Sequence, residues 1–263
     1  MKLPLWLIDA FAERPFSGNP AGVVLLEEPI PDTLMQDIAT ELGQAETAIS
    51  LPRSDGSWEL RWFAPLREVA FCGHATLAAA HAIATERNGA GTITFRTRFV
   101  GDLRVRREER GRYVLDLPRV DPGPADLEAL RTLVPEAAEA FATFENVFAV
   151  LPSERAVRDF APDFAAIEEA LGGMGLTVTA RGAEADMVSR YFAPAAGIPE
   201  DQVTGSIHAT LAPFWAARLG RTRLVAEQAS RRGGRILCDV AGERVLLTGG
   251  AVTVLRGEIV LPD

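Results

Sequence analysis

The sequence predicts an α+β protein built from two similar domains, and three observations support this prediction. Short strand patterns and helix patterns alternate along the 263 residues. A proline-rich stretch at residues 118–124 is typical of a linker, which gives a first domain of residues 1–118 and a second of residues 119–263. A strand–loop–helix unit occurs once in each half. We therefore expect mixed or antiparallel sheets with a cleft between the domains, and a last strand that can return to the first domain.

Hydrophobic periodicity predicts the elements of each half in turn. In the first half, Asp32 is a candidate cap and Gly43 a candidate end for the first helix. Around it we expect strands at residues 5–11, 22–26, 46–51, 57–63, 91–99, 103–107 and 113–117, and a second helix at about 75–87. In the second half we expect helices at 126–133, at 163–171 and from about 205, and strands at 147–151, 176–179, 187–192, 224–228, 236–240, 245–247 and 252–255.

Composition narrows the class of protein. Apolar residues make up 48% of the chain, which is enough for a substantial core, and the net charge is -9. No long run of one sign is present, so neither nucleic acid nor an anionic membrane is the expected partner. The N-terminus has the pattern of a first strand rather than a signal peptide, and no apolar run approaches the ~20 residues that span a bilayer. The default expectation is a protein of the reducing cytoplasm.

Two short sequences recur in the same order. Residues 61–65 (RWFAP) return as residues 190–194 (RYFAP), and residues 74–78 and 208–212 both have the sequence HATLA. Between the two members of each pair lies a loop with an acidic residue and a glycine, and these loops differ in length. Coincidence in an alanine-rich chain is the alternative, but two matches in the same order favour an internal duplication.

The repeated unit predicts a binding site for an anion. In both copies a strand ends at a proline, a loop brings a glycine, and a helix begins. The first turn of a helix has unpaired N–H groups and a partial positive charge, and glycine lets a ligand approach that backbone closely. Two such helix starts facing one cleft would hold a carboxylate and make the neighbouring carbon more acidic. The alternative is that both helix ends simply pack against a sheet.

At these residues the sequence resembles the PhzF-like phenazine biosynthesis family, which shares its fold with diaminopimelate epimerase and proline racemase. The resemblance is carried by residues 9–11 (DAF), 15–23 (PFSGNPAGV), 46–48 (ETA), 63–65 (FAP), 68–69 (EV), 72–76 (CGHAT), 192–194 (FAP), 200–206 (EDQVTGS) and 228–234 (QASRRGG). It implies two similar domains, each a sheet or partial barrel around a central helix, often in a homodimer.

The resemblance also implies a mechanism. Glu46 would be the acid/base group that takes a proton from one carbon and returns it to another, as in a cofactor-independent isomerase that needs no metal. The other site residues it implies are His74 and Asp201 as supporting catalytic groups, and Gly73, Gly205, Ser206 and Asn19 as residues that bind a small carboxylate-bearing substrate. The member that names the family moves a double bond in dihydro-hydroxyanthranilate. Gln202 and Ile207 stand where the family usually has proline and alanine, so the substrate is left open.

Two other functions stay open at this point. An amino-acid racemase or epimerase would use Cys72, whose thiol precedes a helix start, but it needs a second thiol where this chain has Thr204. A non-catalytic binder of small molecules could keep the same fold. Cys238 and His81 are expected to be structural, while the role of His208 is open. The dispersed histidines and the lack of paired cysteines argue against a zinc site, so no metal and no cofactor are expected.

Overall fold

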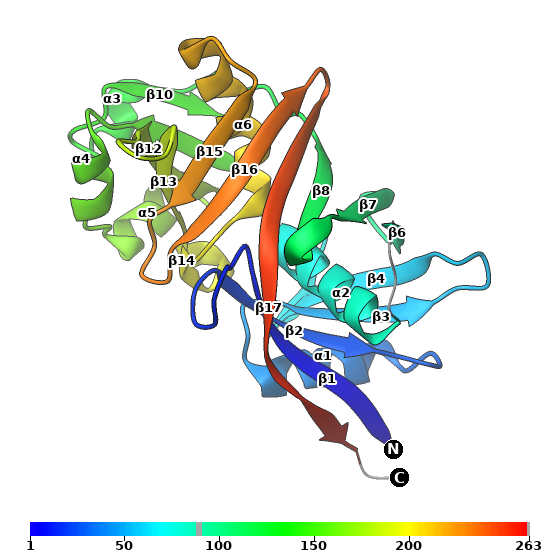
Figure 1. The fold of residues 1–263 in the computed structure, drawn as a ribbon. Coiled ribbons are helices and arrows are strands. Elements are labelled where there is room, and N and C mark those ends of the chain that lie inside the picture. Colours follow the sequence, from blue (N-terminus) through cyan, green and yellow to red (C-terminus); the bar gives the residue numbers. More distant parts are fainter. Residues whose placement is uncertain (88–90, 262–263) are drawn as a thin grey trace. The chain divides into compact units, whose positions relative to one another are not determined.

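A computed structural model describes residues 1–87 and 91–261 of the chain (Figure 1). The chain divides into two compact units, of which the first is formed by Met1–Asp116 together with Thr248–Asp263. The second unit is Leu117–Leu247. This division falls close to the boundary expected after residue 118, and the last strand passes back into the first unit. Within the described ranges, no helix combines the length and the apolar character needed to cross a bilayer.

The first unit is a mixed sheet with two helices. Strand β2 pairs antiparallel with β1 and parallel with β3, β3 pairs antiparallel with β4, and β4 pairs parallel with β6. The C-terminal part of β17 (Arg244–Val260) pairs along the other edge of β1. In chain order the elements are β1 (Lys2–Ala10), β2 (Asn19–Leu25), α1 (Asp32–Leu42), β3 (Thr47–Pro52), β4 (Trp58–Ala64), β5 (Arg67–Val69), α2 (Gly73–Glu86), β6 (Thr92–Thr97), β7 (Asp102–Arg107), a 3-10 turn (Glu109–Gly111) and β8 (Arg112–Pro118).

The second unit repeats this succession of pairings. Strand β11 pairs antiparallel with β10 and parallel with β12, β12 pairs antiparallel with β13, and β13 pairs parallel with β15. The duplication predicted from the repeated sequences is therefore confirmed. In chain order the elements are β9 (Gly123–Pro124), α3 (Leu127–Leu130), β10 (Glu139–Ala142), β11 (Asn146–Val150), α4 (Glu154–Asp159), α5 (Phe164–Leu171), β12 (Gly175–Arg181), β13 (Met187–Ala193), a 3-10 turn (Pro194–Ala196), β14 (Ile198–Asp201), α6 (Gly205–Leu219), β15 (Arg223–Gln228) and β16 (Gly234–Ala241).

An ion pair recurs with the repeated sequences. Arg61 on β4 donates from Nε to Glu68 over 2.8 Å, and Arg190 on β13 donates from Nε to Glu200 over 2.7 Å. Each guanidinium also lies 5.0 Å from the ring centroid of the phenylalanine two residues further along its own strand. The arginine in each unit is held by a carboxylate and by an aromatic ring. Each of these ion pairs therefore fixes the strand that leads into the loop before the central helix.

The helix that follows this loop is central in each unit. In α2, eleven of fourteen residues are buried, and in α6 ten of fifteen are buried. A helix that is apolar on all sides lies inside a fold rather than on its surface. The expectation of a sheet wrapped around a central helix is therefore confirmed for both units, and the fold class is α+β.

The segment expected to be a linker supplies a hydrogen bond that a proline inside α6 cannot make. Pro213 has no N–H to donate to the carbonyl of Ala209, one turn earlier. The N–H of Val120 donates to that carbonyl over 3.1 Å instead, and Arg119 N–H donates to Glu243 over 2.9 Å. Residues 119–120 are therefore hydrogen-bonded into the second unit.

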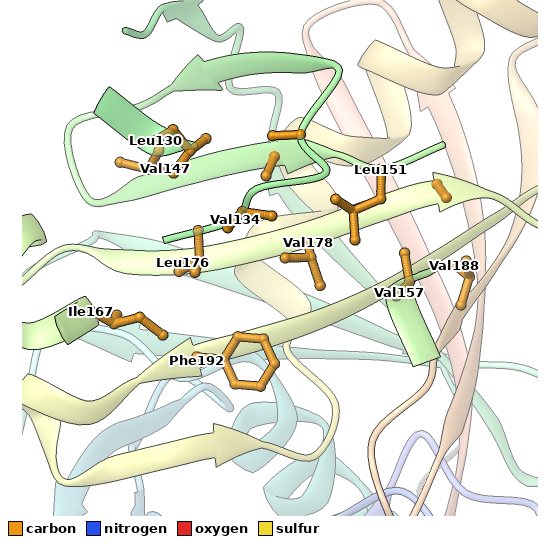
Figure 2. Packing of buried hydrophobic residues seen from close by; sticks show 13 residues of the cluster. Leu130, Val134, Val147, Leu151, Val157, Ile167, Leu176, Val178, Val188 and Phe192 are labelled. Carbon is orange, nitrogen blue, oxygen red and sulfur yellow. The ribbon is translucent and has the colours of Figure 1, made fainter. Parts of the chain in front are cut away.

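Apolar side chains of the second unit gather between its strands and its outer helices (Figure 2). Leu176, Val178 and Phe192 project from β12 and β13 toward Val157 of α4 and Ile167 of α5, and all five are almost fully buried. In the first unit α1 fills the same role, because its buried residues pack against strands β2, β3 and β4. Helices thus join the parallel strand pairs in both units, as a parallel connection requires.

Three details differ from the sequence expectations. Pro31, not Asp32, is the N-cap of α1, and the Asp32 carboxylate accepts from Arg61 over 2.6 Å instead, whereas Gly43 ends the helix with φ 59° as predicted. The two strands expected at residues 245–247 and 252–255 are one long strand, β17. The sequence patterns also missed β5, β10, β14 and α4, which are short elements.

The two HATLA sequences do not occupy equivalent places. Helix α2 begins at Gly73 and α6 at Gly205, so His74 is the second residue of its helix and His208 the fourth. The residue in the place of His208 is Thr76, and both side chains donate to the carbonyl of the N-cap residue, over 2.7 Å and 2.6 Å. His74 and His208 are therefore not equivalent, although their sequence surroundings match.

Candidate active site

Three polar residues of the first unit meet where α2 begins. Asn19 opens β2, Glu46 directly precedes β3, and His74 lies in the first turn of α2. His74 Nε2 lies 3.3 Å from Glu46 Oε2, and Asn19 Nδ2 lies 3.0 Å from His74 Nδ1. The side chains of His74 and Glu46 are 4% and 12% exposed, so a charge on either is shielded from bulk water. We call Asn19, Glu46, Cys72, Gly73 and His74 the Glu46 cluster.

Cys72 and Gly73 complete the Glu46 cluster at the helix start. Cys72 is the N-cap of α2 with extended backbone (φ -146°, ψ 111°), and its side chain accepts no hydrogen bond from the first turn. Its Sγ lies 3.5 Å from His74 Nδ1. Gly73, which follows, is buried and is the first helical residue. The positive end of the α2 dipole therefore lies among a thiol, an imidazole and a carboxylate.

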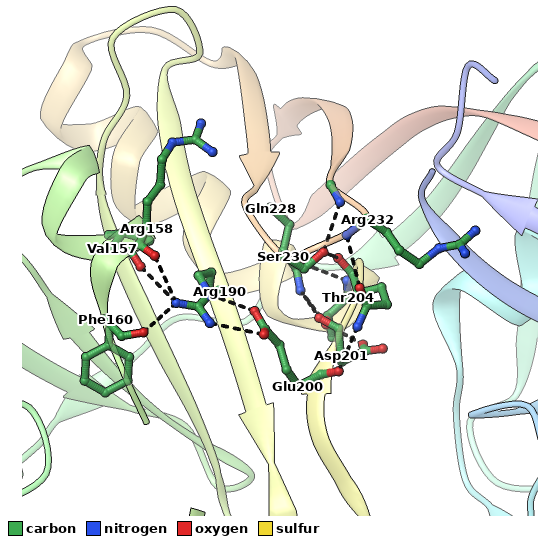
Figure 3. Close-up of polar contacts among 12 residues, drawn as sticks. Val157, Arg158, Phe160, Arg190, Glu200, Asp201, Thr204, Gln228, Ser230 and Arg232 are labelled. Atoms are coloured by element: carbon green, nitrogen blue, oxygen red, sulfur yellow. Dashed lines mark hydrogen bonds and ion pairs between the residues drawn. The ribbon is translucent and has the colours of Figure 1, made fainter. Parts of the chain in front are cut away.

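The second unit has its own polar group at the start of α6 (Figure 3). Asp201 ends β14, and its Oδ2 accepts from Thr204 Oγ1, the N-cap residue of α6, over 2.5 Å. Gln228, at the end of β15 and fully buried, accepts from Thr204 N–H over 2.7 Å and donates to the Asp201 carbonyl over 2.9 Å. These bonds hold the loop before α6. We call Asp201, Thr204, Gly205, Ser206 and Gln228 the Asp201 cluster.

The residues that depart from the family pattern have structural roles in this loop. Gln202 donates from Nε2 to the Glu200 carbonyl over 3.2 Å, and its Oε1 accepts from Arg232 N–H over 3.3 Å. Ser230 Oγ donates to the Gln202 carbonyl over 2.7 Å. Gln202 thus ties the loop before α6 to the β15–β16 turn. Ile207, in α6, is only 1% exposed and belongs to the core, and its effect on the choice of substrate stays a prediction.

The predicted site residues fall into two groups. The structure brings Asn19, Glu46, Gly73 and His74 together in the first unit, and it brings Asp201 and Gly205 together in the second, with the half-buried Ser206 next in the helix. The roles of these residues in binding and catalysis stay predictions. The expectation that both helix starts face one cleft concerns the placement of the two units and also stays a prediction.

The remaining histidines and cysteine are structural. His81 lies between Tyr113 and Thr253, and burial, together with the charge of Arg107, lowers its pKa to about 4. Burial also lowers the pKa of His208 to about 4, and its Nδ1–H donates to the Thr204 carbonyl. Cys238 is fully buried in β16, where burial raises the pKa of its thiol. His208, left open by the sequence, is therefore a neutral residue of the core.

Sequence reasoning missed Gln228 as part of the site. It lies in one of the stretches that carry the family resemblance, but nothing in local periodicity distinguishes it from other polar residues of a strand. The available signal is its place at the end of β15, directly before a turn, where the pattern of alternate burial puts a polar side chain inside. A buried glutamine needs partners for both ends of its amide, so it marks a polar loop beside it.

One group of side chains could hold a metal ion. Among the residues that the structure describes, Glu46, Cys72 and His74 are the group of three whose ligand atoms all lie within 4.8 Å of one another. Sequence spacing gave no zinc pattern because Cys72 and His74 at the start of α2 meet Glu46, which precedes β3, only when the chain folds. The same atoms could instead transfer a proton, since carboxylate and imidazole are the common acid/base groups of enzymes.

The chain matches known proteins over nearly all of its length. The family model for phenazine biosynthesis-like proteins (PhzC-PhzF) matches residues 8–257. A Pseudomonas aeruginosa protein named an uncharacterized isomerase is 46% identical over 98% of this chain and 99% of its own length. A crystal structure of a PhzF-family phenazine biosynthesis protein from Enterococcus faecalis has a TM-score of 0.90 at 40% identity and covers 99% of this chain and 100% of its own.

A more distant likeness concerns the fold alone. A hydroxyproline epimerase from Agrobacterium vitis, 12% identical, has a TM-score of 0.61 and covers 100% of this chain and 93% of its own. The two units, each with a sheet around a buried helix, therefore define an epimerase-like α+β fold. Within that class, the chain belongs to the phenazine biosynthesis-like PhzC-PhzF family, in which similar relatives are named isomerases.

Proposed function

We propose that this chain is a cofactor-independent isomerase that moves a proton on a small carboxylate-bearing substrate, with Glu46 as the acid/base group. The single observation that carries the proposal is the contact of 3.3 Å between Glu46 Oε2 and His74 Nε2 in a nearly buried setting beside the start of α2. Each part of such a reaction has a residue in the Glu46 cluster. The chemistry needs no group that the chain itself lacks.

Glu46 takes a proton from a carbon beside the substrate's carboxyl group in the first step. The electron pair of the broken C–H bond moves into the substrate's conjugated system. Glu46, whose carboxyl proton exchanges with water, then returns a proton to a different carbon, so a double bond shifts and no redox change occurs. Backbone N–H groups at Gly73 and Gly205 stabilise the negative charge that develops on the carboxylate oxygens. General acid/base catalysis by one such group contributes about 10²–10⁴-fold in rate.

His74 and Asn19 prepare Glu46 for this role. With Asn19 Nδ2 donating to His74 Nδ1, the ring carries its proton on Nε2, the nitrogen that lies 3.3 Å from Glu46 Oε2. Asn19, which the sequence resemblance placed among the substrate-binding residues, is 1% exposed and also orients His74. In the second unit, Asp201 and Ser206 supply polar contacts to the substrate, with Asp201 oriented by Thr204.

Solvent exchange tests the proposal. Candidate carboxylates, beginning with dihydro-hydroxyanthranilate, are incubated with chelator-treated protein in D2O and followed by NMR for loss of a C–H signal. We expect exchange without added metal or nucleotide, and a loss of about 10²–10⁴-fold in Glu46→Gln. Glu41→Gln makes the same chemical change at an exposed position of α1 and should leave exchange intact. Full exchange in Glu46→Gln contradicts the role of Glu46.

A racemase that uses Cys72 is the second candidate, favoured by its Sγ lying 3.5 Å from His74. The N-cap of α6 is Thr204, so the second unit has no thiol at the equivalent place. A threonine hydroxyl is too weakly acidic to replace it. If Cys72→Ala abolishes exchange while Glu46→Gln does not, this candidate is correct. Binding of a carboxylate without any exchange indicates a binder instead.

Assembly and location stay predictions. The family resemblance implies a homodimer, and light scattering on the purified chain measures its mass in solution. A cytoplasmic location is the other expectation, and fractionation of cells that express the tagged protein tests it.

A further inference from the structure

We propose that the Glu46 cluster binds one Zn²⁺ ion through Glu46 Oε2, Cys72 Sγ and His74 Nε2, and that the ion inhibits the enzyme. The inhibition rests on the proposed function, whereas the metal site itself does not. Carboxylate, thiolate and imidazole are the three kinds of ligand that zinc takes in proteins. All three are present within 4.8 Å of one another, two at the start of α2 and one directly before β3.

The distances fit a tetrahedral ion. With zinc bonds of about 2.0–2.3 Å, the donors of a tetrahedral site lie about 3.3–3.6 Å apart. The His74 Nε2 to Glu46 Oε2 distance is 3.3 Å, and Cys72 Sγ lies 3.8 Å from His74 Nε2. These two distances are within a few tenths of an ångström of the values that a tetrahedral site needs, and the third pair of donors lies within 4.8 Å. Three protein ligands leave the fourth position open for water, as in sites that exchange their metal.

The surroundings of the three donors also suit zinc. Cys72 caps the positive end of α2, which favours the thiolate that binds metal. Asn19 holds His74 Nδ1 and so keeps Nε2 toward Glu46, as the outer partner of a metal-bound histidine does. When zinc takes Nε2, the proton lies on Nδ1, and rotation of the Asn19 amide presents its oxygen to that proton.

A bound ion would stop the proposed reaction. Zinc occupies the Glu46 oxygen and the His74 nitrogen that the proton transfer needs, and it displaces the thiol proton of Cys72 on binding. The site therefore gives free zinc a means to switch the enzyme off, and a chelator a means to restore it.

Binding of Co²⁺ in place of Zn²⁺ gives an absorption signal for the proposed metal site that needs no substrate. The chelator-treated full chain is titrated with Co²⁺, and absorption is recorded for tetrahedral d–d bands and for the near-ultraviolet charge-transfer band of a cobalt–thiolate bond. We expect both to saturate at one equivalent and to vanish when Zn²⁺ displaces the cobalt. Because Cys72 and Cys238 are the only cysteines of the sequence, the thiolate band can be assigned by mutation.

Variants decide the proposal. Cys72→Ala and Cys72→Ser should each lose the charge-transfer band, while Cys238→Ala, which changes a thiol buried in β16 of the other unit, should keep it. Circular dichroism checks that each variant is folded. Absence of the band in the wild-type chain, or its persistence in both Cys72 variants, overturns the metal site.

Deuterium exchange separates this inference from the proposed function. One equivalent of Zn²⁺ should abolish exchange in the wild-type chain, and excess chelator should restore it. If zinc binds with the cobalt signature but exchange continues, the metal site stands and the role of Glu46 fails. If no zinc binds and exchange is normal, the metal site fails and the proposed function stands.

Discussion

The two units carry the same framework, and they can be compared residue by residue. In β3, Thr47 pairs with Phe63, and in β12, Leu176 pairs with Phe192. Since the two phenylalanines hold the same place in RWFAP and RYFAP, the strands that precede them are in the same register. The residues just before these two positions, Glu46 and Gly175, are therefore equivalent.

This position holds an acid/base candidate in the first unit and a glycine in the second. In the first unit it holds the Glu46 carboxylate beside His74. In the second unit, a Cβ added at Gly175 would lie 2.3 Å from the ring and hydroxyl of Tyr191. The ring of Tyr191 thus fills the space that a side chain would need, and only glycine fits. Both units have the same strands and the same helix start, but at this position the first unit has a carboxylate and the second has none.

The starts of the central helices α2 and α6 also carry different side chains. His74 follows the glycine of α2, and Ser206 follows the glycine of α6. The loop before α6 is held internally by Gln228, whereas the residue at its place in β6, Thr97, donates to the Gly101 carbonyl within its own hairpin. One unit therefore carries groups suited to proton transfer, and the other carries a rigid hydrogen-bonded loop.

The largest expected effect comes from the repeated ion pair. Arg190→Met removes the partner of Glu200 and a donor to three backbone carbonyls, of Val157, Arg158 and Phe160. We expect a loss of about 3–5 kcal/mol in the free energy of unfolding, because the half-buried Glu200 and three carbonyls together lose a charged donor. Urea denaturation measures it, and hydrogen exchange should show added opening at α4.

The matched variant sharpens this comparison. Arg61→Met should cost less, about 1–3 kcal/mol, because Glu68 keeps a second cation: Arg98 donates to it over 3.0 Å. The guanidinium of Arg61 already holds the pKa of Glu68 below its usual range. Equal losses in the two variants would show that the bonds from Arg190 to the carbonyls of residues 157–160 add no stability.

The next effect tests the space at Gly175. Gly175→Ala places a methyl group against the Tyr191 ring, and we expect overpacking to cost about 1–3 kcal/mol. In the double variant with Tyr191→Ala, part of that cost should be recovered, because the obstructing ring is gone. Urea midpoints of the two single variants and the double variant measure the coupling. Gly123→Ala, whose nearest atom would lie 3.9 Å away, is the control.

Strict additivity in this cycle would mean that the Tyr191 ring moves aside freely. The second unit could then accept a side chain at the place of Glu46. The difference between the two units at this position would in that case depend on the residue type alone and not on packing.

Much of the fold was predictable because its signals are local. Apolar periodicity placed most strands and both central helices, and Gly43 marked a helix end through its positive φ. The single strand β17 was split into two by the glycine pair at residues 249–250, which resembles a break. The family resemblance, not periodicity, implied the central position of α2 and α6.

Contacts between distant elements could not be predicted in this way. Nothing in the sequence indicates that Asn19 faces His74, since the pair depends on the packing of β2 against α2. The matching HATLA sequences even suggested a false equivalence of His74 and His208, because a loop of different length shifts the helix start. Local sequence patterns predict which helix or strand a residue belongs to. The candidate site depends instead on how these elements pack against one another, which local patterns do not predict.

A pH dependence follows from the buried histidine of α6. The pKa of His208 is about 4 in the folded chain and about 6.5 when unfolded, so the neutral form stabilises the fold above that pH and the stabilisation is lost as the pH falls toward 4. Between about pH 7 and pH 5 the loss amounts to roughly 2 kcal/mol.

The variant His208→Asn removes this titration while an amide N–H can still donate to the Thr204 carbonyl. At the equivalent place in α2, Thr76 makes the same bond without a titrating group. We therefore expect the variant to lose less stability than the wild-type chain between pH 7 and pH 5, as measured by urea denaturation at each pH. An unchanged pH dependence would show that His208 is not the group responsible.

The smallest effect concerns the helices that join the parallel strand pairs. Asp163 caps α5 in the second unit and accepts from Ala166 N–H over 3.1 Å, whereas the N-cap of α1 in the first unit, Pro31, has no side-chain acceptor. Asp163→Ala should therefore cost about 1 kcal/mol, and Asp163→Asn, which can still cap, only a few tenths. Urea denaturation distinguishes the two. A similar loss in both variants would mean that the charge of Asp163 matters and not its hydrogen bond, since asparagine keeps the acceptor and lacks the charge.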